Sequence, residues 1–261
     1  METAWLNPTD AYRFAFGLEA GPLAETVVLL HKDRLDDIAS LVEPTRWFGG
    51  RWRGFVTHRP PASIAFIPVP AGASDACDCI LHLAAFAPRR LLFTGTCGGL
   101  KPELQIGQVC VATDAWYMGD LLRGLSAPFA AIAGASYLSI PNPESARIID
   151  EFRRTLEIEA QTVRCFTIPV QSIESPSILQ AIRRLGADVI DMETAVCLAA
   201  ARQVGLSCTA LLWCTDRPGE QSFYTMQTQA TSPLRQTAWE AWPRLILRAS
   251  EAMSRPRKQR A

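Results

Sequence analysis

The sequence Val189-Ile190-Asp191-Met192-Glu193-Thr194-Ala195 leads into an alanine-rich segment, which is followed by an apolar run ending in Cys214-Thr215-Asp216. We expect the alanine-rich segment to form a helix and the apolar run to form the next strand. Glu193 then lies at the mouth of the helix, and Asp216 lies 23 positions later at the end of the strand. Two carboxylates at one edge of a sheet predict a site that polarises a small polar substrate.

Short apolar runs alternate with segments of helical pattern along the whole chain. This alternation is typical of an α/β fold in which a largely parallel sheet is covered by helices on both faces. The expected strands are 26–30, 64–69, 90–94, 109–112, 163–167 and 209–213. The expected helices are 34–41, 75–86, 143–156, 178–185, 193–204 and 232–253.

Glycine and proline positions sharpen several of these boundaries. Asn142 before Pro143 predicts a helix start, and Gly186 and Gly205 predict helix ends. Pro243 is expected to kink or divide the last helix. With 261 residues and no low-complexity linker, we expect one domain over 1–254 and a flexible basic tail over 255–261.

Composition limits the classes of partner. Lys plus Arg and Asp plus Glu number 26 each, so the formal net charge is zero and no global field favours nucleic acid. No apolar run is long enough for a membrane helix, and the N-terminus does not resemble a signal peptide. The eight cysteines lie mostly in apolar runs and predict reduced thiols, hence a cytoplasmic protein. We assign no metal and no cofactor, because no Cys/His cluster has zinc spacing.

The run Leu92 to Leu100 is expected to be a strand that ends in a glycine-rich turn, with Thr96 in the middle of the turn. Glycines such as Gly98 let the backbone approach a ligand closely, and Thr96 with neighbouring N–H groups can hold an anion or a sugar oxygen. The run lacks the lysine of a phosphate-binding P-loop and the spacing of a dinucleotide fingerprint.

These segments resemble a known family. Gly95-Thr96-Cys97-Gly98-Gly99-Leu100 followed by Gly107-Gln108-Val109-Cys110-Val111 is similar to the central stretch of the purine nucleoside phosphorylase and uridine phosphorylase superfamily, which includes the methylthioadenosine/S-adenosylhomocysteine nucleosidases. Asp191-Met192-Glu193-Thr194-Ala195 resembles its ribose signature, and Thr215-Asp216 its Ser-Asp pair. The resemblance runs from about residue 12 to residue 225.

The resemblance implies a three-layer α/β fold whose mixed central sheet forms a distorted barrel, assembled as a homodimer or homohexamer. It implies that Glu193 binds the ribose hydroxyls, with Met192 beneath the sugar and Thr96 and Gly98 beside it. A carboxylate there stabilises the oxocarbenium-like sugar of N-glycosidic cleavage. It also implies that Asp216 protonates a departing purine, which requires a raised carboxyl pKa.

The expected anion contacts match only in part. Arg34 and Thr96 correspond to phosphate contacts of the family, and Arg46 or Arg51 to an arginine lent by a neighbouring subunit. Leu30-His31 and Phe93 replace other phosphate contacts. Either phosphate is held differently or water replaces it, as in the nucleosidases, whose catalytic acid has only Glu19 and Glu25 as approximate counterparts.

The expected base contacts depart further. Pro176 stands where the family has an aromatic residue, so Phe223, Tyr224 or Trp213 is expected to contact the base. Arg13 corresponds to a family residue that contacts the 5′ oxygen of the sugar bound by the adjacent subunit. The leading hypothesis is phosphorolysis of a purine-type nucleoside, with inorganic phosphate as co-substrate. Hydrolysis of the same bond and a catalytically silent nucleoside-binding protein are the alternatives.

Overall fold

One mixed sheet runs through the computed structural model of the protein, which describes residues 8–19, 21–31, 34–60, 62–118, 135–139, 143–221 and 233–255. The described strands are β1 (Thr26–His31), β2 (Pro44–Gly49), β3 (Arg53–Arg59), β4 (Ala62–Val69), β5 (Arg90–Gly99), β6 (Val109–Tyr117), β7 (Ser136–Ser139), β8 (Gln161–Thr167), β9 (Val189–Asp191) and β10 (Ser207–Asp216). The described helices are α1 (Pro8–Phe16), α2 (Leu35–Ala39), α3 (Ala73–Leu83), α6 (Pro143–Leu156), α7 (Pro176–Arg184), α8 (Thr194–Gln203) and α10 (Pro233–Ser254), with 3₁₀ turns η1 (Ala84–Phe86) and η2 (Gln171–Ile173).

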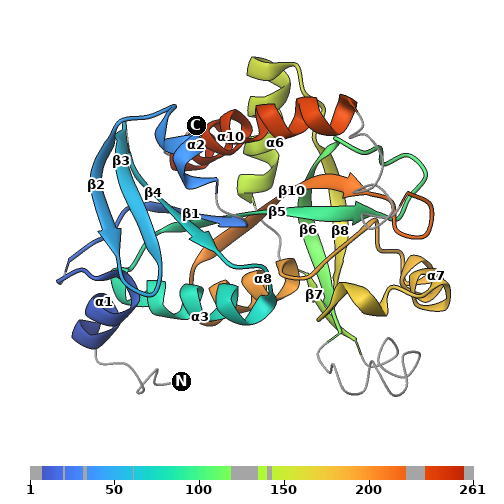
Figure 1. Ribbon diagram of the computed structural model, residues 1–261, viewed down its shortest axis with the longest axis horizontal. Coiled ribbons are helices and arrows are strands. Elements are labelled where there is room, and N and C mark those ends of the chain that lie inside the picture. Colours follow the sequence, from blue (N-terminus) through green and yellow to red (C-terminus); the bar gives the residue numbers. More distant parts are fainter. Residues whose placement is uncertain are drawn as a thin grey trace, which may run out of the picture.

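Five strands close into a barrel. In the order β5–β9–β8–β6–β10 each strand pairs with the next, and β10 pairs back to β5. The β5–β9 and β6–β10 pairs are antiparallel, whereas the other three are parallel. The sheet extends from β5 through β1, β4, β3 and β2, which form the flat part opposite the barrel in Figure 1. The expected mixed, barrel-forming sheet is therefore confirmed, and the expectation of a largely parallel sheet is wrong.

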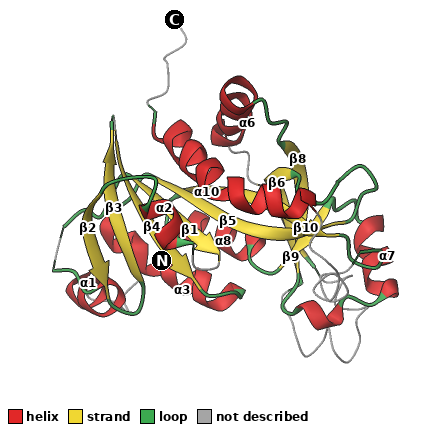
Figure 2. Ribbon diagram, turned by 45° about the horizontal axis from the view of Figure 1, so that its top comes forward, coloured by secondary structure: helices red, strands yellow, loops and turns green. Residues whose placement is uncertain are grey.

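Helices lie on both faces of the extended part of the sheet, as Figure 2 shows from a second direction, whereas α7 lies beside the barrel. Strand β1 is buried at every position, so its side chains alternate between the two layers. Val27 and Leu29 pack with residues of α3 and α8, and Val28 and Leu30 pack with residues of α2, α6 and α10. Burial on both faces explains why these strands read as continuous apolar runs.

All six expected strands and all six expected helices are present, with boundaries that differ by a few residues. Gly186 and Gly205 have positive φ angles of 85° and 74°, as expected of helix ends. Asn142 and the tail beyond Arg255 lie outside the described residues. Pro243 does not divide α10, which continues through it because residues on both sides are buried against the core.

Five elements were not expected: α1, β2, β3, β7 and β9. Strand β2 is mostly exposed, so it lacks the apolar run that marked the other strands. Strand β9 has only three residues and is defined by its partners β5 and β8 rather than by its own sequence.

The glycine-rich run at 95–99 is not a turn, because β5 continues through Gly99. Glycine is required there by close packing. A Cβ atom on Gly98 would lie 2.6 Å from Cγ of Pro218 and 3.1 Å from Cγ2 of Ile190. Gly98 thus allows the segment after β10 and strand β9 to approach β5.

Seven of the eight cysteines are buried, all eight are free thiols, and Cys77 is half-buried. Burial raises the pKa of Cys79 and Cys208, to about 12 for Cys208. These thiols therefore stay protonated at neutral pH and pack as small apolar groups.

We expect Gly98→Ala to lower the free energy of unfolding by about 1–3 kcal/mol, because Pro218 or Ile190 must move to admit the methyl group. Denaturant unfolding measures this change. Gly49→Ala is the matched control, since a Cβ atom at position 49 would have its nearest neighbour 3.9 Å away. Equal stability of the two variants would contradict the packing argument.

Candidate active site

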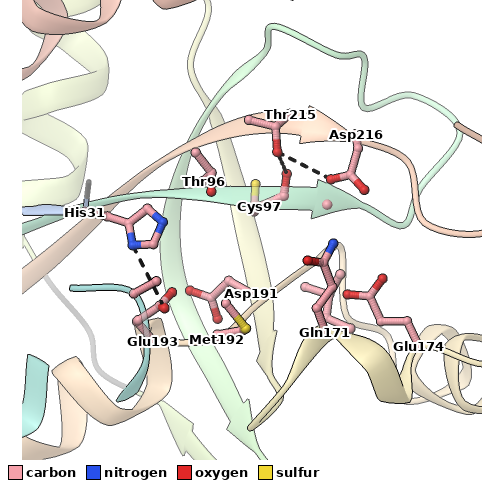
Figure 3. A pocket seen from close by; sticks show the side chains of 13 residues that line it. His31, Thr96, Cys97, Gln171, Glu174, Asp191, Met192, Glu193, Thr215 and Asp216 are labelled. Carbon is pink, nitrogen blue, oxygen red and sulfur yellow. Dashed lines mark hydrogen bonds and ion pairs between the residues drawn. The ribbon is translucent and has the colours of Figure 1, made fainter. Parts of the chain in front are cut away.

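A cavity of about 210 Å³ lies at the junction of the barrel and the extended sheet. Figure 3 shows His31 and Glu193 at one end, Glu174 and Asp216 at the other, and Thr96 with Cys97 along one wall between them. The described residues that line it are His31, Ala71, Thr96, Cys97, Gly98, Gln171, Glu174, Ile190, Asp191, Met192, Glu193, Thr215 and Asp216. The cavity therefore collects the ends of β1, β5, β9 and β10.

Glu193 is the residue before helix α8, but its side chain does not cap the helix. Its Oε1 atom instead accepts a hydrogen bond of 2.7 Å from the backbone N–H of Gly72, in the turn between β4 and α3. Gly72 has a φ angle of 118°, a conformation that favours glycine. Glu193 is almost fully buried and lines the cavity.

The side chain of Asp191 caps helix α8 instead. Its Oδ2 accepts a hydrogen bond of 2.8 Å from the N–H of Thr194, and its Oδ1 accepts one of 2.6 Å from the Thr167 hydroxyl. The Thr167 hydroxyl also accepts a bond of 2.9 Å from the N–H of Ala195. Burial raises the pKa of Asp191, and these hydrogen bonds act against the rise. Asp191 and Thr167 thus fix the turn that presents Glu193.

Asp216 is the last residue of β10 and is buried beside Gly98, its neighbour in the pairing with β5. The hydroxyl of Thr215 lies 3.4 Å from Oδ1 of Asp216 and 3.4 Å from the carbonyl oxygen of Cys97. Thr96, Gly98 and Met192, the other predicted contacts, line the same cavity. The structure therefore brings together five of the predicted site residues, namely Thr96, Gly98, Met192, Glu193 and Asp216.

Glu174 was not expected in the site. It lies between η2 and α7 and lines the cavity at the end where Asp216 lies. Burial, with a smaller contribution from the negative charge of Asp216, raises the pKa of Glu174 to about 7. The available sequence signal was an acid directly before Ser175-Pro176, which starts α7 with a serine N-cap and a proline in its first turn.

The predicted cationic contacts do not reach this cavity within the chain. Arg34 is buried elsewhere, with Nε 2.5 Å from Oδ2 of Asp37 and its guanidinium 3.9 Å from the ring centre of Trp239. Arg46 on β2 is exposed and lies near the carbonyl oxygen of Leu23. Arg34 therefore does not line this cavity, because α10 holds its side chain, and its role as an anion contact remains a prediction.

Arg13 and Arg51 also lie away from the cavity. Arg13 is exposed on α1, and Arg51 binds Asp75 and Asp78 of its own chain. Contacts of Arg13 or Arg46 with an adjacent subunit remain predictions. Glu19 is exposed, and Glu25 lies 3.8 Å from Arg89, so neither supplies an acid to the cavity.

The expected aromatic contact is absent from the described part of the lining. Trp213 is buried in the core, where its ring centre lies 5.5 Å from that of Trp239 and 6.1 Å from that of Trp242. It therefore cannot contact a base in the cavity. Phe223 and Tyr224 lie outside the described residues.

Acidic groups dominate the described lining. Four carboxylates, Glu174, Asp191, Glu193 and Asp216, share the cavity with one histidine and with no arginine or lysine in the described ranges. The described part of the lining is therefore predominantly acidic. Within the described residues no cluster of three or more His, Cys, Asp or Glu side chains could hold a metal ion, and none of the described helices could cross a membrane.

Comparisons with known proteins agree with this geometry. Residues 23–240 match the family model of the phosphorylase superfamily. No curated protein matches significantly. The structure is similar to a methylthioadenosine/S-adenosylhomocysteine nucleosidase from Campylobacter jejuni, with TM-score 0.71, 15% identity and coverage of 87% of this chain and 99% of that one.

Two further solved structures share the fold. One is a futalosine hydrolase mutant from Helicobacter pylori, with TM-score 0.66, 13% identity and coverage of 87% of this chain and 99% of that one. The other is a purine nucleoside phosphorylase from Toxoplasma gondii in complex with immucillin-H, with TM-score 0.68, 22% identity and coverage of 90% of this chain and 92% of that one. At these identities the likeness establishes the fold.

The raised pKa of Glu174 predicts a pH dependence of stability. An unfolded glutamate loses its proton near pH 4.5, whereas folded Glu174 holds it to about pH 7. The folded state therefore binds more protons in this window, and Glu174 makes the protein less stable as pH rises from about 4.5 to 7. Thermal unfolding of Glu174→Gln should show a smaller loss of stability across the window than the natural protein. Substitution of the exposed Glu103 should leave the loss unchanged, and an unchanged loss in Glu174→Gln would refute the assignment.

Proposed function

Because the chain belongs to the phosphorylase superfamily, we propose that it is an enzyme that cleaves the N-glycosidic bond of a purine-type nucleoside or a related ribosyl compound. We further propose that water is the attacking group. One observation carries the proposal: Glu193 and Asp216 line one cavity together with Thr96 and Gly98. A sugar at the Glu193 end and a base at the Asp216 end fit this arrangement.

Glu193 is the group that stabilises the sugar. As the C1′–N bond breaks, the sugar acquires oxocarbenium character, and a buried carboxylate on its hydroxyls stabilises that charge. The hydrogen bond from Gly72 fixes one oxygen of Glu193 and leaves the carboxylate directed to the cavity. Met192 and Ile190 supply apolar surface beside the sugar.

Asp216 is the group that assists the leaving base. A departing purine carries negative charge, so a proton delivered to its ring nitrogen makes it a better leaving group. Glu174 lies at the same end and titrates at about pH 7, so this pair of acids can hold a proton near neutrality. Purine-type bases are therefore the proposed leaving groups.

The choice of water follows from charge. Phosphate carries one to two negative charges and needs cationic donors close to the sugar. The described lining offers four carboxylates and one histidine instead, and Arg34 packs against Trp239. Phosphorolysis is the second candidate, since Thr96 lines the cavity and the exposed Arg46 and Arg13 could be lent to a neighbour within a homodimer or homohexamer.

Product analysis tests the choice of nucleophile. We expect incubation with a panel of purine nucleosides to release free base and free ribose at the same rate with and without inorganic phosphate. Chromatography of the sugar product and labelling from ¹⁸O water measure this outcome. Formation of ribose 1-phosphate that requires phosphate would replace hydrolysis by phosphorolysis. Binding of a nucleoside with no product over long incubation would identify a silent binding protein.

Two substitutions test the roles of the acids. Asp216→Asn and Glu193→Gln should each lower kcat by about 10²–10⁴-fold, because each removes a group that acts in the transition state. Asp216→Asn should recover most of its activity on a riboside with a nitrophenol leaving group, which needs no proton, whereas Glu193→Gln should not. Steady-state kinetics on both substrates distinguish the roles, and equal losses on both substrates for Asp216→Asn would exclude it as the acid.

A further inference from the structure

His31 is the one imidazole among the described residues that line the cavity, and the steps above do not use it. It is the last residue of β1 and is 8% exposed. Its Nδ1 atom lies 3.9 Å from Oε1 of Glu193, a distance of ionic contact rather than of a direct hydrogen bond. In the sequence, Leu30-His31 stands where the family was expected to have a phosphate contact.

We propose that His31 is the general base that takes a proton from the attacking water. The inference rests on the proposed function and adds a catalytic residue to it. The position of His31 at the Glu193 end of the cavity supports this role. The attacking water must reach C1′ of a sugar whose hydroxyls bind Glu193. A general base must come within about 3 Å of the water oxygen, and Figure 3 shows His31 on the cavity wall at the same end as Glu193.

The orientation of the ring fits this task. Figure 3 shows one ring nitrogen directed to Glu193 and the other directed toward the space beside Thr96 and Cys97. With Nδ1 carrying its hydrogen toward the carboxylate, Nε2 presents its lone pair to the water proton. The Gly72 hydrogen bond holds the same Oε1 atom of Glu193 in place, 3.9 Å from Nδ1 of His31.

Charge around the ring stabilises the product of proton transfer. When His31 accepts the proton, the imidazolium faces Glu193 at the start of α8, and Asp191 on β9 also lines the cavity. Glu174 before α7, Asp216 on β10 and the Cys97 thiol on β5 are the other titratable groups of the described lining. Carboxylates at these positions favour the positive charge that forms during attack.

The proposed step balances. The water oxygen forms a bond to C1′ as the C1′–N bond breaks, and the electron pair of that bond moves to the base. His31 takes one proton from the water, and Asp216 gives one proton to the base. The products are ribose and neutral base, and exchange with solvent returns the proton from His31 to Asp216.

His31→Gln tests the inference with little change of size. We expect kcat for hydrolysis to fall by about 10²–10⁴-fold with KM changed less than about threefold. The loss should be equal on a purine nucleoside and on the nitrophenyl riboside, since both need activated water. The acid limb of the kcat profile, which in the natural protein reflects protonation of His31, should disappear, and added imidazole should restore part of the rate. His58→Gln, on an exposed histidine of β3, is the matched control and should behave as the natural protein.

The outcomes separate the inference from the function on which it rests. If the natural protein cleaves nucleosides with water and His31→Gln keeps its rate and pH profile, His31 is not the base and the proposed function stands. If turnover requires phosphate and His31→Gln changes only the KM for phosphate, the general-base role is excluded. If the natural protein releases no base, the proposed function itself fails. His31→Asn with a check of thermal unfolding replaces His31→Gln should the latter not fold.

Discussion

The short antiparallel pairing of Gly98 with Ile190 and of Gly99 with Val189 closes the barrel, and the cavity depends on it. This pairing lies at the end of β5, so it brings the segment after β9 against the strand that also pairs with Asp216. Only glycine at 98 leaves room for Ile190 and Pro218 at that point. Glu193 and Asp216 thereby line the same cavity.

In the turn from Asp191 to Thr194, Asp191 stabilises the start of the helix, and Glu193 is left available for chemistry. Asp191 caps α8 and binds Thr167 on the neighbouring strand, which leaves Glu193 without a capping duty. Glu193 is then available to the cavity and receives its orientation from Gly72 of a different connection. A helix start held by two strands is rigid, and rigidity of this kind preorganises a carboxylate for transition-state stabilisation.

Much of this could be predicted from the sequence, for identifiable reasons. The doubly buried strands read as apolar runs, and the motif around Glu193 and the Thr215-Asp216 pair carried enough pattern to assign both acids. Glu174 was missed as a cavity residue because nothing local distinguishes it from a surface charge, and His31 was noted only as a replacement for a phosphate contact. Arg34 was assigned by its position in a motif and Trp213 as a replacement for a missing aromatic, but packing against Trp239 holds both side chains away from the cavity. Glycine is favoured both in turns and where strands pack too closely for a side chain. The glycine run at 95–99 was therefore interpreted as a turn.

The concentration of acids in so small a volume has a consequence for molecules other than substrates. A compact amine shaped like a ribose ring carries from the outset the positive charge that a nucleoside develops only as its bond to the base breaks. The buried carboxylate of Glu193 on the cavity wall would therefore attract such an amine before any bond breaks. Inhibitors of this protein should be designed as cations, and an added phosphonate or carboxylate would weaken them.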